Sequence, residues 1–322
     1  MRDIKDFIIE DGVLLKYVGD DSSVTIPDGV VALGDFCFED TNVEEVILPS
    51  TVENIFGAAF NETPNLQRIV VDSANIKYCS VDGCLYSKDK KRFICSPNRT
   101  DTLYIAEGCE VIESYAFFQR RVSGIVFPKT LKCFEHSALC NCYIDAEELI
   151  IPDVEFRDGE WFNATIFPPI VKVEGIKTLA GWTFAYSSFG AMCLPDTLTE
   201  IGAWAFGCCN MKRIYVPKSV VKVGEYAFAI DCPIEEVQES KPYDPLEDYD
   251  IYELEDEPTT NDGPLSEEEF TAQSTWPCPI GFVLGVDNEE CAIAQYARDN
   301  NIPYEVVADV DAFLNEMPFE AI

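Results

Sequence analysis

Short runs of alternating apolar and polar residues recur along the chain. The first is Val24 to Ile26, and it closes at Pro27. Other runs close in the same way at Pro49, Asp72, Ala106, Pro128, Pro152, Pro195 and Pro217. Alternation places the first and third residues of a run on one face of a strand and the second on the other. Because proline has no N–H to donate, it ends the strand, and the pattern predicts a series of short strands.

The spacing of these closing positions is nearly constant. Pro27, Pro49 and Asp72 lie 22 and 23 residues apart, and Pro195 and Pro217 lie 22 apart. A bulky residue follows eleven positions later in six copies, as Phe38, Phe60, Phe117, Leu139, Phe206 and Phe228. One unit of about 22 residues is too small to bury its own apolar face, so neighbouring units must stack. We therefore predict a repeat solenoid of about nine to eleven turns, mostly β, with a parallel sheet on one face and an irregular backing.

Two segments interrupt the repeat with an Asp-Gly pair between apolar runs, which is a strong hairpin signal. One is Ile8 to Lys16, and we expect it to cap the N-terminal end of the solenoid. The other is Ser80 to Lys88, and it lies in an interval of 34 residues between Asp72 and Ala106. We expect an inserted hairpin near residues 78–97.

The distribution of charge along the chain indicates a further division into segments. Residues 235–270 hold fifteen Asp and Glu against one Lys, which is about −14 of the formal charge of −35. We therefore predict repeats over residues 1–237, an acidic and mobile insertion over 238–275, a terminal repeat and cap over 276–306, and a tail over 307–322. The alternative for the insertion is a docking segment, because tyrosines interrupt the acids.

One copy of the repeat reads Leu198 to Cys208 after Pro195, with Ile-Gly followed by Ala-Trp-Ala-Phe. This phrase resembles the BspA-like, or Treponema pallidum-type, leucine-rich repeats. Residues 292–304 are similar to the terminal helix and last strand of that family. The resemblance covers about residues 7–237 and 276–306, and it implies a leucine-rich-repeat horseshoe with a concave sheet and a short C-terminal helix. For function, it implies adhesion and protein recognition.

The acidic balance changes the expected partners. Nucleic acid and anionic membranes would be repelled, and no basic stripe is present, so we expect a protein partner and no cofactor. The sequence shows no signal peptide and no apolar segment as long as a membrane span. Fourteen cysteines without a disulfide-like spacing favour a reducing compartment. As the sequence stands we expect a cytoplasmic protein, or a surface protein if an export signal has been removed.

The outward residue of each run should form one row on the concave sheet. The row consists of Thr25, Ile47, Val70, Tyr104, Val126, Ile150, Lys172, Cys193 and Tyr215. Most of these residues are apolar or aromatic. Two explanations remain open, because β-branched residues favour strands in any case, whereas a contiguous exposed apolar patch marks an interaction surface. If the row binds a partner, Tyr104 and Tyr215 are the expected anchors, because aromatic residues are enriched among binding hot spots.

Cys133, His136, Cys140 and Cys142 combine zinc-binding residue types within ten positions. Their spacing matches no common zinc finger. Cys140 and Cys142 also follow the bulky Leu139, which is where the repeat places other cysteines. We therefore favour a structural role for these cysteines and expect no metal.

An enzyme is the weakest hypothesis. His136 is the only histidine, and it falls at a variable position of the repeat. We find no glycine-rich phosphate loop, no HExxH and no GxSxG. The favoured hypothesis is a non-enzymatic protein-interaction module that uses the concave row, with an adhesion-like role. The alternative is a self-associating structural protein whose row or end packs against another copy.

Overall fold

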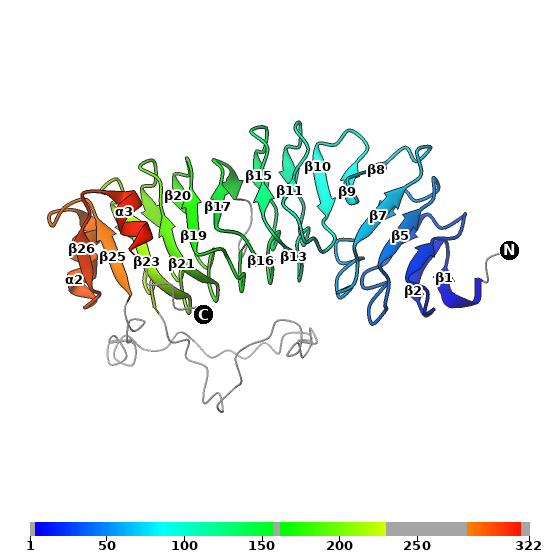
Figure 1. Ribbon diagram of the computed structural model, residues 1–322, viewed down its shortest axis with the longest axis horizontal. Coiled ribbons are helices and arrows are strands. Elements are labelled where there is room, and N and C mark those ends of the chain that lie inside the picture. The colour runs from blue at the N-terminus through cyan, green and yellow to red at the C-terminus, as the bar shows by residue number, and fades with distance from the viewer. Residues whose placement is uncertain (1–3, 157–161, 230–281, 317–322) are drawn as a thin grey trace, which may run out of the picture.

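The computed structural model describes residues 4–156, 162–229 and 282–316. The chain winds into an elongated solenoid, and its strands follow one another along the long axis in chain order from β1 to β26 (Figure 1). The expected acidic insertion and the end of the tail lie outside the described residues. Most strands pair in parallel with the strand one coil before and one coil after. The predicted repeat solenoid with a parallel sheet is confirmed.

The first row of strands contains the runs that close at the proline positions. It consists of β3 (Ser23–Thr25), β5 (Glu45–Leu48), β7 (Arg68–Val71), β11 (Leu103–Tyr104), β14 (Ile125–Val126), β17 (Glu148–Ile151), β19 (Ile170–Val173), β21 (Ser188–Cys193), β23 (Asn210–Val216), β25 (Val283–Val286) and β26 (Tyr304–Val306). These strands form three ladders, β3-β5-β7, β11-β14 and β17-β19-β21-β23-β25-β26.

The backing is more regular than expected, because it carries a second row of short parallel strands. These are β2 (Val13–Tyr17), β4 (Ala32–Leu33), β6 (Asn54–Ile55), β10 (Arg92–Cys95), β12 (Val111–Ile112), β15 (Cys133–Phe134), β18 (Glu155–Phe156), β20 (Thr178–Leu179), β22 (Glu200–Ile201) and β24 (Lys222–Val223). A further parallel pair joins β13 (Arg121–Val122) to β16 (Tyr143–Ile144). Several neighbouring coils are therefore joined through both rows, as β19 and β20 are joined to β21 and β22.

Both Asp-Gly segments form antiparallel hairpins. At the N-terminal end, η1 (Ile4–Asp6) leads into β1 (Phe7–Glu10), which pairs with β2. The inserted hairpin pairs β8 (Tyr78–Val81) with β9 (Cys84–Ser87) and sits between β7 and β10. At the C-terminal end, α2 (Ala292–Asp299) lies against β24 and β25, and α3 (Val310–Asn315) follows β26.

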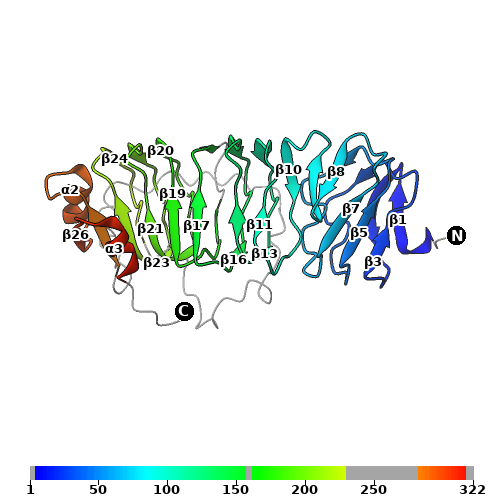
Figure 2. The ribbon, with the colours of Figure 1, turned by 45° about the horizontal axis from the view of Figure 1, so that its top comes forward.

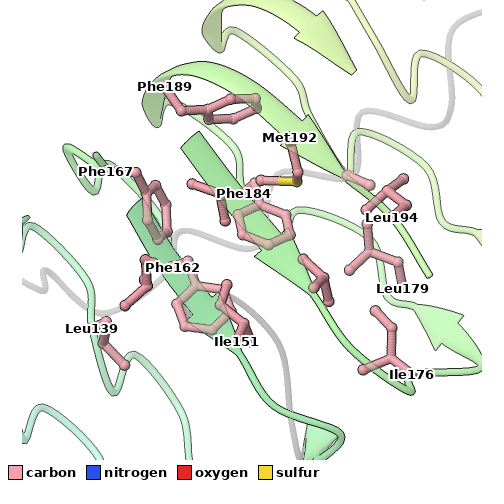
Figure 3. Close-up of a cluster of buried hydrophobic side chains, with 14 of the residues drawn as sticks. Leu139, Ile151, Phe162, Phe167, Ile176, Leu179, Phe184, Phe189, Met192 and Leu194 are labelled. Atoms are coloured by element: carbon pink, nitrogen blue, oxygen red, sulfur yellow. The ribbon is translucent and has the colours of Figure 1, made fainter. Parts of the chain in front are cut away.

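A ladder of phenylalanine rings fills the space between the two rows. Phe162, Phe184, Phe206 and Phe228 stack with ring centroids 5.1, 5.4 and 5.2 Å apart, and they are almost fully buried. Figure 3 shows Phe162 and Phe184 packed among aliphatic side chains from both rows. Burying one such side chain stabilises the fold by about 1.5–3 kcal/mol. The bulky residue of the repeat therefore contributes directly to the cohesion between coils.

The inserted hairpin divides this core into two clusters. Strand β9 supplies Leu85 to the N-terminal cluster and Cys84 and Tyr86 to the longer one. The buried Arg120 crosses the division, and its guanidinium donates to the carbonyl oxygen of Thr63 at 2.9 Å and to that of Phe60. Strands β5 and β7 are inclined to β10 in Figure 1. The hairpin thus marks a joint in the solenoid, and Arg120 bridges it.

Scarce cations form ion pairs between adjacent coils. Glu110 binds Lys91 of the coil before at 2.9 Å and Lys132 of the coil after at 2.5 Å. Glu45 accepts from Arg68 Nε at 2.7 Å, one coil further on. Exposed pairs of this kind contribute little each, typically about 0–1 kcal/mol. Each of these ion pairs joins residues about one repeat apart, and so each links two adjacent coils.

Candidate functional site

The register of the first row places the predicted outward residues side by side. Thr25 pairs with Ile47, Ile47 with Val70, and Tyr104 with Val126. Ile150, Lys172, Cys193 and Tyr215 pair in the same way from coil to coil. The row then continues through Gly285 and Glu305, which the sequence analysis did not include.

Exposure is highest in the middle of the row. Tyr104 is 71% exposed, Val126 45% and Ile150 44%, whereas the flanking Ile47 and Val70 are half-buried. Strand β11 pairs with β14, and β14 contacts β17, so these three side chains come from consecutive coils. We call Tyr104, Val126 and Ile150 the central patch.

The expectation that Tyr215 is exposed is wrong. It lies on the outward face as predicted, but it is only 6% exposed because α3 covers it. Phe313 and Leu314 of α3 are buried against Ala191 and Tyr215, and Figures 1 and 2 show α3 at the C-terminal end of the row. Tyr215 therefore cannot serve as an anchor while α3 is docked.

Gly285 makes room for this helix. A Cβ at that position would lie 2.9 Å from the ring of Phe313 and 2.8 Å from the side chain of Val307. The Tyr215 hydroxyl donates to Asp287 at 2.9 Å. Burial, and then the bond to this carboxylate, raise the pKa of Tyr215 above its ordinary value.

Charged contacts hold α3 in place. The guanidinium of Arg213 lies 4.9 Å from the centre of the Phe313 ring and binds Glu316 at 3.4 Å. Lys172 lies 3.9 Å from Asp311, and Asp309 caps the helix by accepting from the Ala312 amide at 3.0 Å. The capping Asp309 before an apolar pair was the signal in the sequence that could have revealed this helix.

Lys172 and Cys193 form the border between the central patch and α3. Lys172 binds Glu148 at 3.3 Å, so a carboxylate on the neighbouring strand β17 balances its positive charge. Cys193 is half-buried, and its burial raises the thiol pKa to about 11. At neutral pH this thiol is protonated, and it behaves as a small apolar group.

The four weak zinc candidates do not form a metal site. Cys133 and Cys142 are buried, Cys140 is half-buried and His136 is exposed. Burial raises the pKa of Cys142 far above that of a free thiol, which opposes the thiolate that zinc requires. Within the described ranges, no group of three or more His, Cys, Asp or Glu side chains could hold a metal ion.

Comparison with known families identifies the repeat. The model of the BspA type leucine rich repeat region matches in six copies, over residues 16–145, 90–162 and 157–249. Together these stretches span well over half of the chain. The chain belongs to the BspA-type leucine-rich repeat family. The resemblance based on the Ile-Gly and Ala-Trp-Ala-Phe phrase is therefore confirmed, although no curated protein matches the sequence.

Solved structures of bacterial leucine-rich repeat proteins are similar in fold. One from Eubacterium ventriosum is 19% identical with a TM-score of 0.51, and the match covers 71% of this chain and 70% of the other. The pneumococcal vaccine antigen PcpA is 15% identical with a TM-score of 0.44, covering 89% and 68%. A leucine rich cell surface protein from Faecalibacterium prausnitzii is 16% identical with a TM-score of 0.32, covering 70% and 90%. At these identities the likeness concerns the fold alone.

The described helices of this BspA-type chain are few and short. None of them is long and apolar enough to cross a membrane.

Proposed function

We propose that this BspA-type solenoid is a non-enzymatic protein-interaction module and that the central patch is its contact surface. The observation that supports the proposal is the exposure of Tyr104, Val126 and Ile150, between 44 and 71%, on three consecutive coils. Contiguous apolar surface is costly to leave in water and usually marks a binding site. Tyrosine offers a large apolar ring and a polar hydroxyl, which suits it as an anchor.

The limits of the patch support the same proposal. On one side the row becomes half-buried at Val70, and on the other it reaches the charged Lys172, beyond which α3 covers Tyr215. A small apolar centre with a polar border is the usual arrangement of a protein interface. The adhesion-like role is a finer proposal that depends on the nature of the partner. The absence of catalysis and of a cofactor also stays a prediction.

The test is capture of a partner by the immobilised full chain. The double variant Tyr104→Ser and Ile150→Ser should lose the bound protein, because two of the three apolar side chains of the patch are removed. Val221→Ser is the matched control, since Val221 is also 71% exposed but lies outside the row. The captured protein is identified by mass spectrometry and then titrated in purified form against each variant. Equal affinity of the double variant and the control would exclude the central patch.

Self-association is measured on the same variants. Light scattering of the purified chain at tens of micromolar should show a monomer if the patch binds another protein. A dimer that dissociates in the double variant would instead support the structural alternative, in which the patch packs against a second copy.

A further inference from the structure

An open cleft of about 890 Å³ lies at the joint of the solenoid, and it shares no residue with the central patch. It is bounded by the start of β7, the tip of the inserted hairpin, the segment that leads into β11, and the turn before β13. Its lining consists of Pro64, Asn65, Gln67, Arg68, Asp82, Gly83, Asn98, Arg99, Thr100, Asp101, Gln119 and Arg121. Every lining residue except Pro64 and Gly83 has a polar side chain.

The charge of the cleft differs from that of the whole chain. Three arginines and two aspartates line it, a local balance of +1, whereas the chain has a formal charge of −35. Arg99 is committed to the structure, since its guanidinium binds Asp82 and Asp101, each at 2.9 Å. Arg68 binds Glu45 of the coil before. The structural ion pairs therefore account for both aspartates and for two of the three arginines.

The third arginine is left without an acid. The guanidinium of Arg121 lies 4.3 Å from the centre of the Tyr143 ring, which orients it. Among the residues that the structure describes, no carboxylate forms an ion pair with it. An oriented guanidinium with free donors is the group that binds a carboxylate with two parallel hydrogen bonds.

The amides of the cleft supply both donors and acceptors. Gln119 accepts from the Glu62 amide N–H through its oxygen, which leaves its NH₂ group free. Asn65 donates its NH₂ group to Asn42, which leaves its oxygen free. The side chain of Gln67 has no hydrogen-bond partner among the described residues and offers both groups. Free donors and acceptors side by side suit hydroxyl groups, because a hydroxyl both donates and accepts.

We propose that this cleft binds an acidic sugar, a compound that carries one carboxylate and several hydroxyls. Arg121 binds the carboxylate, and Gln67, Asn65 and Gln119 bind the hydroxyls. The volume falls in the range of small-ligand sites, roughly 300–1,000 Å³, and ten of the twelve lining residues offer polar side-chain groups to a ligand. An acidic peptide would present repeated carboxylates, for which the cleft offers one uncommitted cation.

The experiment titrates the full chain with D-glucuronate and compares D-glucose and acetate, with binding followed by ligand-observed NMR and calorimetry. Glucuronate should bind saturably, and glucose and acetate at least about tenfold more weakly, because each lacks half of the recognised groups. Equal binding of acetate would overturn the proposal in favour of a general anion site. Binding of a poly-glutamate peptide without binding of glucuronate would overturn it in favour of an acidic peptide.

Variants connect the binding to the cleft. Arg121→Gln should weaken glucuronate binding at least about tenfold, and Arg121→Lys should fall between it and the unchanged chain, because lysine keeps the charge but not the paired donors. Lys129→Gln removes an exposed cation outside the cleft and should have no effect. Thermal unfolding of each variant checks that the fold is intact. Unchanged affinity in a folded Arg121→Gln variant would overturn the proposal.

Discussion

Among single residues, glycine has a clear role where two coils approach most closely. A Cβ on Gly202 would overlap the backbone nitrogen of Gly181 and would lie 2.7 Å from the carbonyl carbon of Ala180. The glycine of the Ile-Gly phrase is therefore needed because the neighbouring coil leaves no room for a side chain, and not because a turn requires it. At Gly57, in contrast, the nearest atom would be a Tyr115 ring carbon at 3.8 Å.

Gly202→Ala should lower the free energy of unfolding by about 1–3 kcal/mol, because the added methyl group forces two coils apart. Denaturant titration measures the change. Gly57→Ala is the matched control and should stay within about 0.5 kcal/mol of the unchanged chain. Equal stability of the two variants would show that the coils can separate at Gly202 without cost.

The surroundings of Glu62 disfavour the charged form of its carboxyl group. Burial first, and then the nearby Glu39 and Asp40, raise its pKa above the ordinary value. In the folded chain its charged form is therefore disfavoured, so Glu62 lowers stability at neutral pH. As the pH falls through the raised pKa, this carboxyl takes up a proton and the destabilisation disappears.

Glu62→Gln should raise the free energy of unfolding at pH 7 by up to about 0.5 kcal/mol. The gain should vanish below the ordinary carboxyl pKa of 4.5, where the unchanged side chain is neutral as well. Thermal unfolding at both pH values gives the comparison, with Glu107→Gln as a control for removing one exposed charge. Glutamine already occupies the equivalent turn position, as Gln119, with the same positive φ.

For single residues, the sequence predicts burial or exposure correctly wherever the position within the repeat determines what surrounds the side chain. The positions of Phe206 and Phe228 in the core, and of Tyr104 on the outward face, follow from the 22-residue register. Tyr215 has the same register but a different environment, because a helix from the end of the chain covers it. The cleft around Arg121 likewise depends on four segments that a repeat pattern does not relate.

At the scale of elements, α3 is a helix outside the repeat that covers the C-terminal part of the row of outward residues. Two of its apolar residues, Phe313 and Leu314, are 3% and 2% exposed, while Ala312 of the same helix faces solvent. A helix of six residues is too short to be stable alone, so its formation depends on docking. The same argument explains why it was not predicted from its sequence.

Replacing Phe313 and Leu314 with Ser should release α3 and expose Tyr215. Nitration of tyrosines followed by mass spectrometry should then modify Tyr215, which should be protected in the unchanged chain. Ala312→Ser is the control, since it changes the solvent face of the same helix. If Tyr215 stays protected in the double variant, a contact other than these two side chains covers it.

The second row of strands was not predicted for a similar reason. Most of its members contain only two residues, as in β12 and β22, and two residues cannot show an alternating pattern. Their parallel pairing arises from stacking that the first row and the Phe ladder already impose. The Asp-Gly hairpins, in contrast, have a local signal and appear where expected.

At the scale of the whole molecule, we expect the inserted hairpin to limit the cooperativity of unfolding. Each coil contacts mainly its neighbours, so the solenoid unfolds as one unit only where the interfaces between coils are strong. At the hairpin the core divides into two clusters, and the bonds of Arg120 to Phe60 and Thr63 reach across the division.

Arg120→Met should therefore separate the unfolding of the two parts. The substitution removes the hydrogen bonds that the charged guanidinium donates to these two carbonyl oxygens, at a cost of about 1–3 kcal/mol, whereas the bonds from the Thr63 hydroxyl to Phe60 O and from the Leu66 amide to Thr63 O remain. Hydrogen exchange in increasing urea should show residues 14–71 unfolding before residues 162–216 in the variant, and together in the unchanged chain. Lys129→Met is the control for removing an exposed cation. A single shared transition in the variant would show that other contacts couple the clusters.

The ion pairs between coils also limit how the chain can fold wrongly. Because the repeats are alike in length and core, a coil could stack on the wrong neighbour and still bury its phenylalanine. If the coil of Glu110 were skipped, however, Lys91 would face Lys132, and two cations would meet where two ion pairs now form. Such pairs stabilise the native state little, but repulsion between like charges destabilises a misassembled state. The few basic residues therefore help each coil to stack on the correct neighbour during folding.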